Sequence, residues 1–344
     1  MTYVLSDRYN RYFYLAPADD TFEFQSLLMD TNTAINLEKF YYNPQKMNDI
    51  DIKATTEFLL NNIKSDPVYG FAVQEACWDY TLGRLNEGQY QKMTSALENQ
   101  YNWDISKIQQ HALSQGQLFK NDVFRSKVKE LETLTDQIEE CNPFLVGSYA
   151  CILKILIVQI KHKNPLKSIY EYLDYVNNEI MTNYALETQL AVNYFLGNDK
   201  MYALGNSIFK FDRKKENVLL KACNASWDMF FLRLLQMSHF HSGVSKTLNT
   251  FKPHLVTADH GIKNFAQLCS VEAVIKKDNK FVPILSFIEG NIKNEYLKHV
   301  ENIESELYFK VLEREAARDI LNGDSNSYLL ESITKLEKEL KLIS

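Results

Sequence analysis

Residues 26–32 read SLLMDTN, and residues 254–261 read HLVTADHG. Each is a short apolar run that stops at an aspartate, Asp30 in the first and Asp259 in the second. Such a run predicts a buried strand whose C-terminal tip presents the carboxylate, and open α/β sheets place ligand sites at these tips. The two runs therefore predict one shared acidic site. A divalent cation is the plainest reason to hold the like charges together, because without it their repulsion would drive a proton onto one carboxylate.

The composition is that of a folded chain in which helices dominate. The 344 residues, 45% of them hydrophobic and 24% charged, suffice for one large or two ordinary domains. Only 11 glycines and 7 prolines are present, which disfavours a loop-rich all-β architecture. A net charge of -6 argues against a globally basic nucleic-acid binder, but it leaves local basic patches and metal-bridged contacts to phosphate open.

Cysteine usage and hydropathy indicate a cytoplasmic protein without a membrane partner. The 5 cysteines are scattered, without a C-x-x-C pair, so neither a disulfide framework nor a thiolate zinc site is expected. The N-terminus lacks the apolar core of a signal peptide, and no stretch reaches the roughly 18 uncharged residues of a membrane span. The nearest, Leu145 to Ile160, contains Lys154, and we expect a buried helix there.

Predicted strands lie at both ends of the chain, and predicted helices fill the middle. The expected strands are Arg11–Leu15, Phe24–Met29, Val68–Val73, His254–Thr257 and a hairpin over 271–288 that turns at Asp278-Asn279. Residues 87–217 carry successive helical patterns, with breaks expected at Asn142-Pro143 and Asn164-Pro165 among others. Helices are expected again at Val218–Phe240 and Ile262–Cys269, and two charged helices at Asn291–Ile343, the first ending near residues 322–324.

This order of elements predicts an α/β domain interrupted by a helical insertion. Residues 1–86 and 218–290 would form the discontinuous core, residues 87–217 a large all-helical insertion, and residues 291–344 the C-terminal helices. The helical regions could also carry a protein partner or a homo-oligomer interface. No fixed-period repeat is present in the sequence, so solenoid architectures are disfavoured.

The order of the acidic residues resembles that of the PIN-like nucleases. Asp30-Thr31-Asn32 resembles the family's first strand tip, and Thr257-Ala258-Asp259 resembles its last. Between them, Glu75 and Asp228 look like the family's two helical acidic residues. The resemblance covers about the first eighty residues and the stretch from Val218 to about Ile288. The spacings from Glu75 to Asp228 and from Asp228 to Asp259 are longer than in compact members of the family.

The resemblance implies a small, mainly parallel sheet flanked by helices, and a metal-dependent endoribonuclease that acts on single-stranded RNA in preference to DNA. Asp30 and Asp259 would be primary ligands of Mg²⁺ or Mn²⁺, with Glu75 and Asp228 acting directly or through water. A role as a toxin or phage-defence effector is suggested only by the roles of other members of the family.

The chemistry of such a site is phosphodiester hydrolysis. Oxygen ligands suit Mg²⁺ or Mn²⁺, and Mg²⁺ leaves part of its octahedron to water and substrate phosphate. A metal-bound water deprotonates more easily than bulk water, and a second ion roughly 4 Å away can stabilise the leaving oxygen. Asn32 and Thr257 would orient a carboxylate or a bound water through hydrogen bonds. Glu187 competes with Glu75 as the helical carboxylate, and His260 is the one histidine that we would test at this site.

Three alternatives remain open. An aspartate between a strand and a helix is most often an N-cap that accepts a hydrogen bond from a backbone N–H. Haloacid-dehalogenase-like phosphotransferases also use an aspartate after the first strand, but their second aspartate is here Asn32, which cannot donate a proton as that acid must. The third alternative is a non-catalytic helical interaction protein built on a degenerate PIN-like core.

Overall fold

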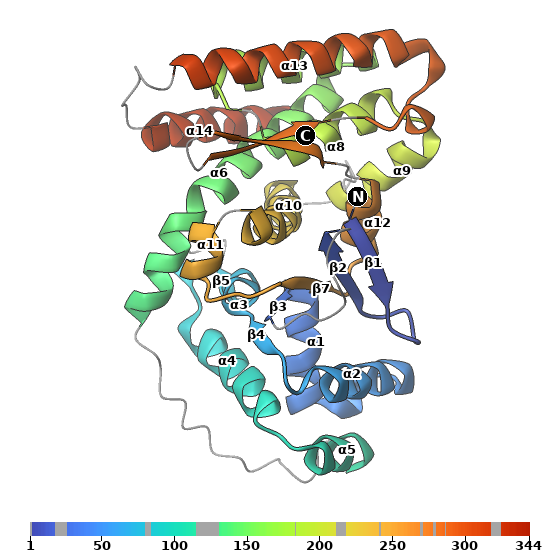
Figure 1. Ribbon diagram of the computed structural model, residues 1–344, viewed down its shortest axis with the longest axis vertical. Coiled ribbons are helices and arrows are strands. Elements are labelled where there is room, and N and C mark those ends of the chain that lie inside the picture. Colours follow the sequence, from blue (N-terminus) through green and yellow to red (C-terminus); the bar gives the residue numbers. More distant parts are fainter. Residues whose placement is uncertain are drawn as a thin grey trace. The chain divides into compact units, whose positions relative to one another are not determined.

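The computed structural model describes residues 2–17, 26–79, 84–114, 131–182, 184–210, 218–240, 242–268, 271–277, 280–285, 287–317 and 325–344. It is a mixed α/β structure dominated by helices (Figure 1). The chain divides into two compact units. The sheet unit comprises Thr2–Glu139 and Leu234–Lys263, and the helical unit comprises Glu140–Arg233 and Asn264–Ser344.

A mixed five-stranded sheet organises the sheet unit. Its strands are β1 (Thr2–Ser6), β2 (Phe13–Pro17), β3 (Ser26–Met29), β4 (Asp66–Val68) and β7 (His254–Thr257). They lie in the order β1-β2-β7-β3-β4. The inner strand β3 pairs in parallel with both β4 and β7, whereas β2 is antiparallel to β7 and to β1. The orange strand β7 thus lies beside the blue N-terminal strands, although they are distant in sequence (Figure 1).

Burial explains why the two apolar runs become neighbouring strands. All four residues of β3 and all four of β7 are buried, as expected of parallel strands covered on both faces. Leu27, Leu28, Leu255 and Val256 are each at most 1% exposed. Each such side chain contributes about 1.5–3 kcal/mol when it leaves water. Burial on both faces therefore holds these two strands in the interior of the sheet unit.

Six helices in the described part of the chain belong to the sheet unit, and the first of them contacts strand β7 directly. They are α1 (Thr31–Tyr42), α2 (Asp49–Asn62), α3 (Gly70–Cys77), α4 (Glu87–Tyr101), α5 (Ile105–Ser114) and α11 (Ser242–Thr247). A 3₁₀ turn (Pro44–Lys46) and the short strand pair β5 (Trp78–Asp79) and β6 (Arg84–Leu85) complete the unit. Helix α1 contacts α2, α3, α4 and β7, and it buries Leu37 and Phe40 in this packing. Asn48 and Asn86 cap α2 and α4 through their side-chain oxygens.

The helical unit combines packed helices with a β-hairpin. Its elements are α6 (Leu131–Lys161), α7 (Pro165–Asp174), a π-helical turn (Tyr175–Glu179), α8 (Ala185–Leu196), α9 (Asp199–Phe209), α10 (Val218–Phe240), α12 (His260–Leu268), β8 (Val271–Lys277), β9 (Lys280–Leu285), two 3₁₀ turns (Glu289–Asn291 and Asn294–Tyr296), α13 (Leu297–Ala317) and α14 (Ser325–Ile343). Three of these helices cross the boundary between the units along the chain. Helix α6 begins in the sheet unit, α10 ends in it, and α12 begins in it. Strand β9 contacts α8 and α13.

Helix α6 supplies apolar core to the helical unit. Every residue from Ala150 to Val158 is buried. The segment Phe144–Lys161 is long and apolar enough to cross a membrane, and 61% of it is buried inside the structure. A buried core helix of a soluble protein meets the same criteria of length and composition. The expected break at Asn142-Pro143 is wrong, because α6 runs through it. A proline removes only one helical hydrogen bond, and the burial that follows outweighs a cost of about 3 kcal/mol.

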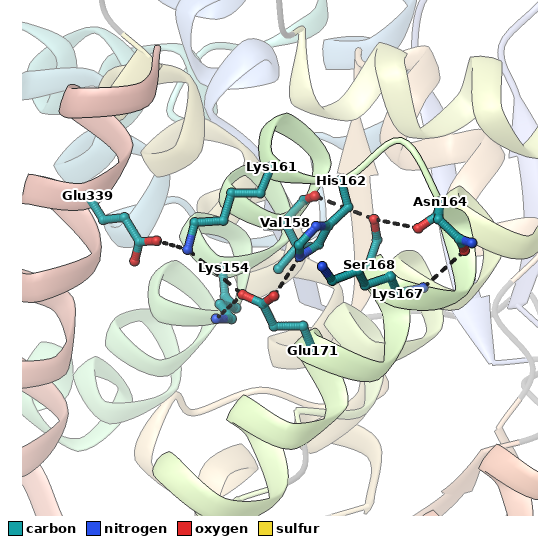
Figure 2. Close-up of polar contacts among 9 residues, drawn as sticks. All are labelled: Lys154, Val158, Lys161, His162, Asn164, Lys167, Ser168, Glu171 and Glu339. Carbon is teal, nitrogen blue, oxygen red and sulfur yellow. Dashed lines mark hydrogen bonds and ion pairs between the residues drawn. The ribbon is translucent and has the colours of Figure 1, made fainter.

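A charged cluster joins α6, α7 and α14 within the helical unit (Figure 2). Glu171 on α7 accepts a hydrogen bond from Lys154 Nζ at 3.0 Å, and its other oxygen lies 2.6 Å from His162 Nε2. Lys161 forms an ion pair with Glu339 on α14 and lies 3.9 Å from Glu171. Burial raises the pKa of Glu171, but the hydrogen bonds from His162 and Lys154 and the lysine charges outweigh it and lower the pKa to about 2.

Several predicted elements are confirmed, and others are corrected. The strand His254–Thr257, the hairpin formed by β8 and β9, and the helical character of the described part of 87–217 are confirmed. The strand expected at Val68–Val73 is wrong over most of its length, because β4 ends at Val68 and α3 begins at Gly70. Residues 24–25, the turn at 278–279 and the helix end at 322–324 lie outside the described residues.

Candidate functional site

The C-terminal tips of β3 and β7 lie at the same edge of the sheet. Met29 is the partner of Val256 in the parallel register, and the backbone N–H of Asp30 donates to the carbonyl of Val256 at 3.0 Å. Asp30 directly follows β3, and Asp259 comes two residues after β7. Parallel pairing therefore brings two acidic residues together that are far apart along the chain.

Asp30 is a buried carboxylate with two hydrogen-bond donors. It is 1% exposed. One oxygen accepts from the backbone N–H of Thr33 at 2.7 Å, and the other accepts from the hydroxyl of Thr257 at 2.5 Å. Burial raises the pKa of Asp30 to about 6, because the opposing effect of these hydrogen bonds is smaller and the negative charge of Asp259 adds to the rise. An aspartate with such a pKa carries a desolvated charge at neutral pH.

Asp259 lies at the start of α12 and is half-buried. Its Oδ1 accepts from the backbone N–H groups of Gly261 at 2.6 Å and Ile262 at 3.3 Å. Its own N–H donates to the hydroxyl oxygen of Thr257 at 2.9 Å. The Thr257 hydroxyl therefore donates to Asp30 and accepts from Asp259, which ties the two strand tips together.

Glu75 reaches the same neighbourhood through Thr31, for which the sequence predicted no role of its own. The hydroxyl of Thr31 donates to Glu75 Oε2 in a short hydrogen bond and lies 3.4 Å from the carbonyl oxygen of Ala72. Glu75 is half-buried on α3, which packs against α1. Because Thr31 directly follows Asp30, this contact holds Glu75 near the first strand tip. The small polar residue after the aspartate was the only signal for Thr31 in the sequence.

Asn32 and His260 are exposed beside this cluster. Asn32 lies in the first turn of α1, and its side chain makes no hydrogen bond to any residue in the described part of the chain. The His260 ring opens α12 and lies edge-on to Phe13, with ring centroids 4.8 Å apart.

Asp228 and Glu187 belong to the helical unit. Asp228 is half-buried on α10, and its membership in the acidic cluster remains a prediction. Glu187 is fully buried on α8. It forms an ion pair with Arg233 and accepts a hydrogen bond from the Ser148 hydroxyl at 2.5 Å. Arg233 also donates to the carbonyl of Phe144 at 3.3 Å, so both charges of this pair have several partners.

The strand tips could serve a hard cation with few protein ligands. Within the described residues, no group of three or more His, Cys, Asp or Glu side chains is arranged to hold a metal ion. Mg²⁺ is commonly held by only one or two carboxylates, with waters completing its octahedron. Each carboxylate oxygen has about two lone pairs, so an oxygen of Asp30 that accepts one hydrogen bond retains one more site. Two carboxylates remain adequate in number for this ion.

The strand-tip aspartates also act as helix caps. Asp30 is the N-cap of α1, and Asp259 accepts from two N–H groups of the first turn of α12. Both roles place negative charge at the positive end of a helix dipole, where it is stabilised.

Comparison with known proteins finds no matching family model, no matching curated protein and no matching solved structure.

Proposed function

We propose that this protein is a metal-dependent nuclease on a PIN-like fold, acting on RNA in preference to DNA. The observation that carries the proposal is the pairing of Asp30 and Asp259 at adjacent tips of parallel strands, joined by the Thr257 hydroxyl. Holding a buried and a half-buried carboxylate near each other costs stability unless something compensates their charges. A cation between the carboxylates would compensate both. A cytoplasmic location and a role as a toxin or defence effector belong to the same proposal.

The donor set fits Mg²⁺ or Mn²⁺. Asp30 and Asp259 would hold the ion, and Glu75 would act directly or through a bound water from its position beside Thr31. Asp228, the fourth acidic residue that the sequence predicts as a ligand, belongs to the other unit and stays a prediction. When bound, the ion lowers the pKa of a coordinated water and stabilises negative charge on phosphate oxygens.

The chain's own residues would orient these ligands. The Thr257 hydroxyl fixes the orientation of the Asp30 carboxylate, and the N–H groups of Thr33 and Gly261 each fix one aspartate oxygen. Such hydrogen bonds hold ligands in a geometry that needs little rearrangement during the reaction. The first turns of α1 and α12 both point their positive ends at this edge, which favours an anionic phosphate there.

The N-cap contacts favour one competing function class, a non-catalytic interaction protein in which both aspartates only terminate helices. A haloacid-dehalogenase-like phosphotransferase is the other alternative. It would require the exposed Asn32 to act as a general acid, and an amide cannot donate a proton in that way. Both alternatives predict that replacing Asp259 leaves nucleic-acid cleavage unaffected, because neither assigns cleavage to it.

The test is cleavage of labelled single-stranded RNA and DNA with Mg²⁺, with Mn²⁺ and with EDTA. We expect Asp30→Asn and Asp259→Asn to lower the cleavage rate by about 100-fold or more, since each removes a ligand charge while keeping the side-chain shape. The matched control is Asp49→Asn, an exposed aspartate in the first turn of α2 in the same unit. Cleavage at the wild-type rate in both strand-tip variants would contradict the proposal.

A further inference from the structure

Lys263 lies one helical turn after Asp259, close to the acidic strand tips. Lys263 is half-buried on α12, and its backbone N–H donates to the carbonyl of Asp259, one turn earlier. Its ammonium group lies 4.6 Å from the centroid of the Phe13 ring. Across the described part of the chain, no carboxylate lies within 4.0 Å of this ammonium group. Among the described residues, the positive charge is thus positioned by Phe13 without a carboxylate to neutralise it.

Phe13 connects Lys263 to the candidate metal ligands. Its side chain is fully buried, and Phe13 is the cross-strand partner of Thr257 in the pairing of β2 with β7. Cross-strand partners have Cβ atoms about 4.5–5.5 Å apart on the same face of a sheet. Thr257 in turn hydrogen-bonds Asp30. The chain of contacts from Lys263 through Phe13 and Thr257 therefore ends at the carboxylate of Asp30.

The aromatic ring fixes the lysine without satisfying its charge. The attraction of the ammonium group to the aromatic face selects one side-chain conformation. His260 lies three residues earlier on the same helix face and also packs against Phe13. A positioned cation beside an acidic metal site is suited to a substrate with several negative charges. One phosphate would lie at the carboxylates, and a neighbouring phosphate at Lys263.

We propose that Lys263 is a phosphate-contacting residue that selects a polynucleotide strand over a small phosphate ester, with single-stranded RNA as the substrate class. This inference rests on the proposed nuclease function for its location. Its readout is strand binding, so it can fail or succeed independently of cleavage.

The variant for the test is Lys263→Met, which keeps an unbranched stem against Phe13 and removes the charge. Lys263→Arg restores the charge, and Lys53→Met on α2 is an exposed control in the same unit. Binding of a fluorescent single-stranded RNA is measured by anisotropy in Ca²⁺ over a series of salt concentrations. Thermal unfolding of each variant checks that it is folded.

We expect Lys263→Met to weaken binding about 5–10-fold at low salt and to reduce the slope of log K against log salt by about 0.7, the value for one lost phosphate contact on a single strand. Lys263→Arg and Lys53→Met should bind as the wild type does. An unchanged slope in folded Lys263→Met, or an equal loss in Lys53→Met, would overturn the inference while leaving the cleavage result for Asp30 and Asp259 intact. Binding that depends on Lys263 without any cleavage would instead refute the nuclease proposal alone.

Discussion

Replacing Asp30 by asparagine should stabilise the metal-free protein at neutral pH. The carboxylate is buried, and its pKa is raised to about 6 from an ordinary value of 3.8. The folded state therefore holds a proton that the unfolded state has already released, and folding becomes less favourable as pH rises between these two values. Asparagine keeps an acceptor for the Thr33 N–H and carries no charge.

The magnitude follows from the shift in the pKa of Asp30. A difference of about 2 pH units corresponds to about 3 kcal/mol of lost stability once the pH exceeds 6. About half of this loss, roughly 1.4 kcal/mol, develops between pH 5 and pH 8. The free-energy difference between Asp30→Asn and the wild type should therefore change by about that amount in favour of the variant over this interval. The rearranged contact with Thr257 adds an offset that does not depend on pH.

The assay is urea unfolding of both proteins in EDTA at pH 5, 6, 7 and 8, because a bound cation would mask the effect. Asp49→Asn is the matched control, and its difference from the wild type should stay constant since its side chain is exposed to solvent. A difference for Asp30→Asn that does not change with pH would refute the reasoning, because the carboxylate would then cost nothing to ionise in the fold.

Three further predictions concern the helical unit. Glu171→Gln should cost about 1–2 kcal/mol of stability at pH 7, a value discounted because the side chain is 31% exposed. Because the pKa of Glu171 is lowered, this stability is fully present above pH 4.5 and is lost as the pH falls toward 2. Urea unfolding at pH 7 and 3.5 should therefore show a smaller difference between variant and wild type at the lower pH. Arg233→Met should cost about 3–5 kcal/mol in chemical denaturation, because it leaves Glu187 buried without its cation, and adding Glu187→Gln should recover part of the loss. Gly147→Ala should cost about 1–3 kcal/mol in thermal unfolding, since a methyl group there would lie 1.7 Å from the Tyr184 hydroxyl; no loss would mean that this ring moves freely.

The sequence was sufficient to predict elements whose burial is continuous. The apolar run His254–Thr257 and the helical pattern of Val218–Phe240 have the observed bounds, because each is long enough or apolar enough to be defined by its own residues. The strand β1 was missed, since Thr2–Ser6 is a short segment whose place in the sheet comes from its pairing with β2. Tertiary pairing of this kind leaves little trace in local sequence.

The strand predicted at Val68–Val73 is replaced over most of its length by a helix. Pro67 lacks an N–H and is tolerated only at a sheet edge, which is where β4 lies. The aromatic and β-branched residues that follow were assigned to a strand, but Gly70–Cys77 is helical, and it buries Phe71, Ala72 and Val73. The helix at this position is what brings Glu75 to the hydroxyl of Thr31.

The strand-tip pairing was the part of the site that sequence could predict. Two apolar runs ending in aspartate imply parallel neighbours, and the register of β3 with β7 brings Asp30 and Asp259 to one edge. The roles of Thr31 and Lys263 could not be predicted, because they depend on the packing of α3 and α12 against distant elements. The boundary between the two compact units falls at Glu140, inside the helical insertion predicted over residues 87–217. The amino-acid composition offered no signal for a boundary there.

The shared metal site is tested most directly by an anomalous difference map from crystals of the protein soaked in Mn²⁺. We expect a peak at coordination distance from the carboxylate oxygens of both Asp30 and Asp259, and no peak there in Asp30→Asn crystals soaked in the same way. A map without density between these two carboxylates at a saturating Mn²⁺ concentration would contradict the shared site, and the aspartates would then be helix caps alone.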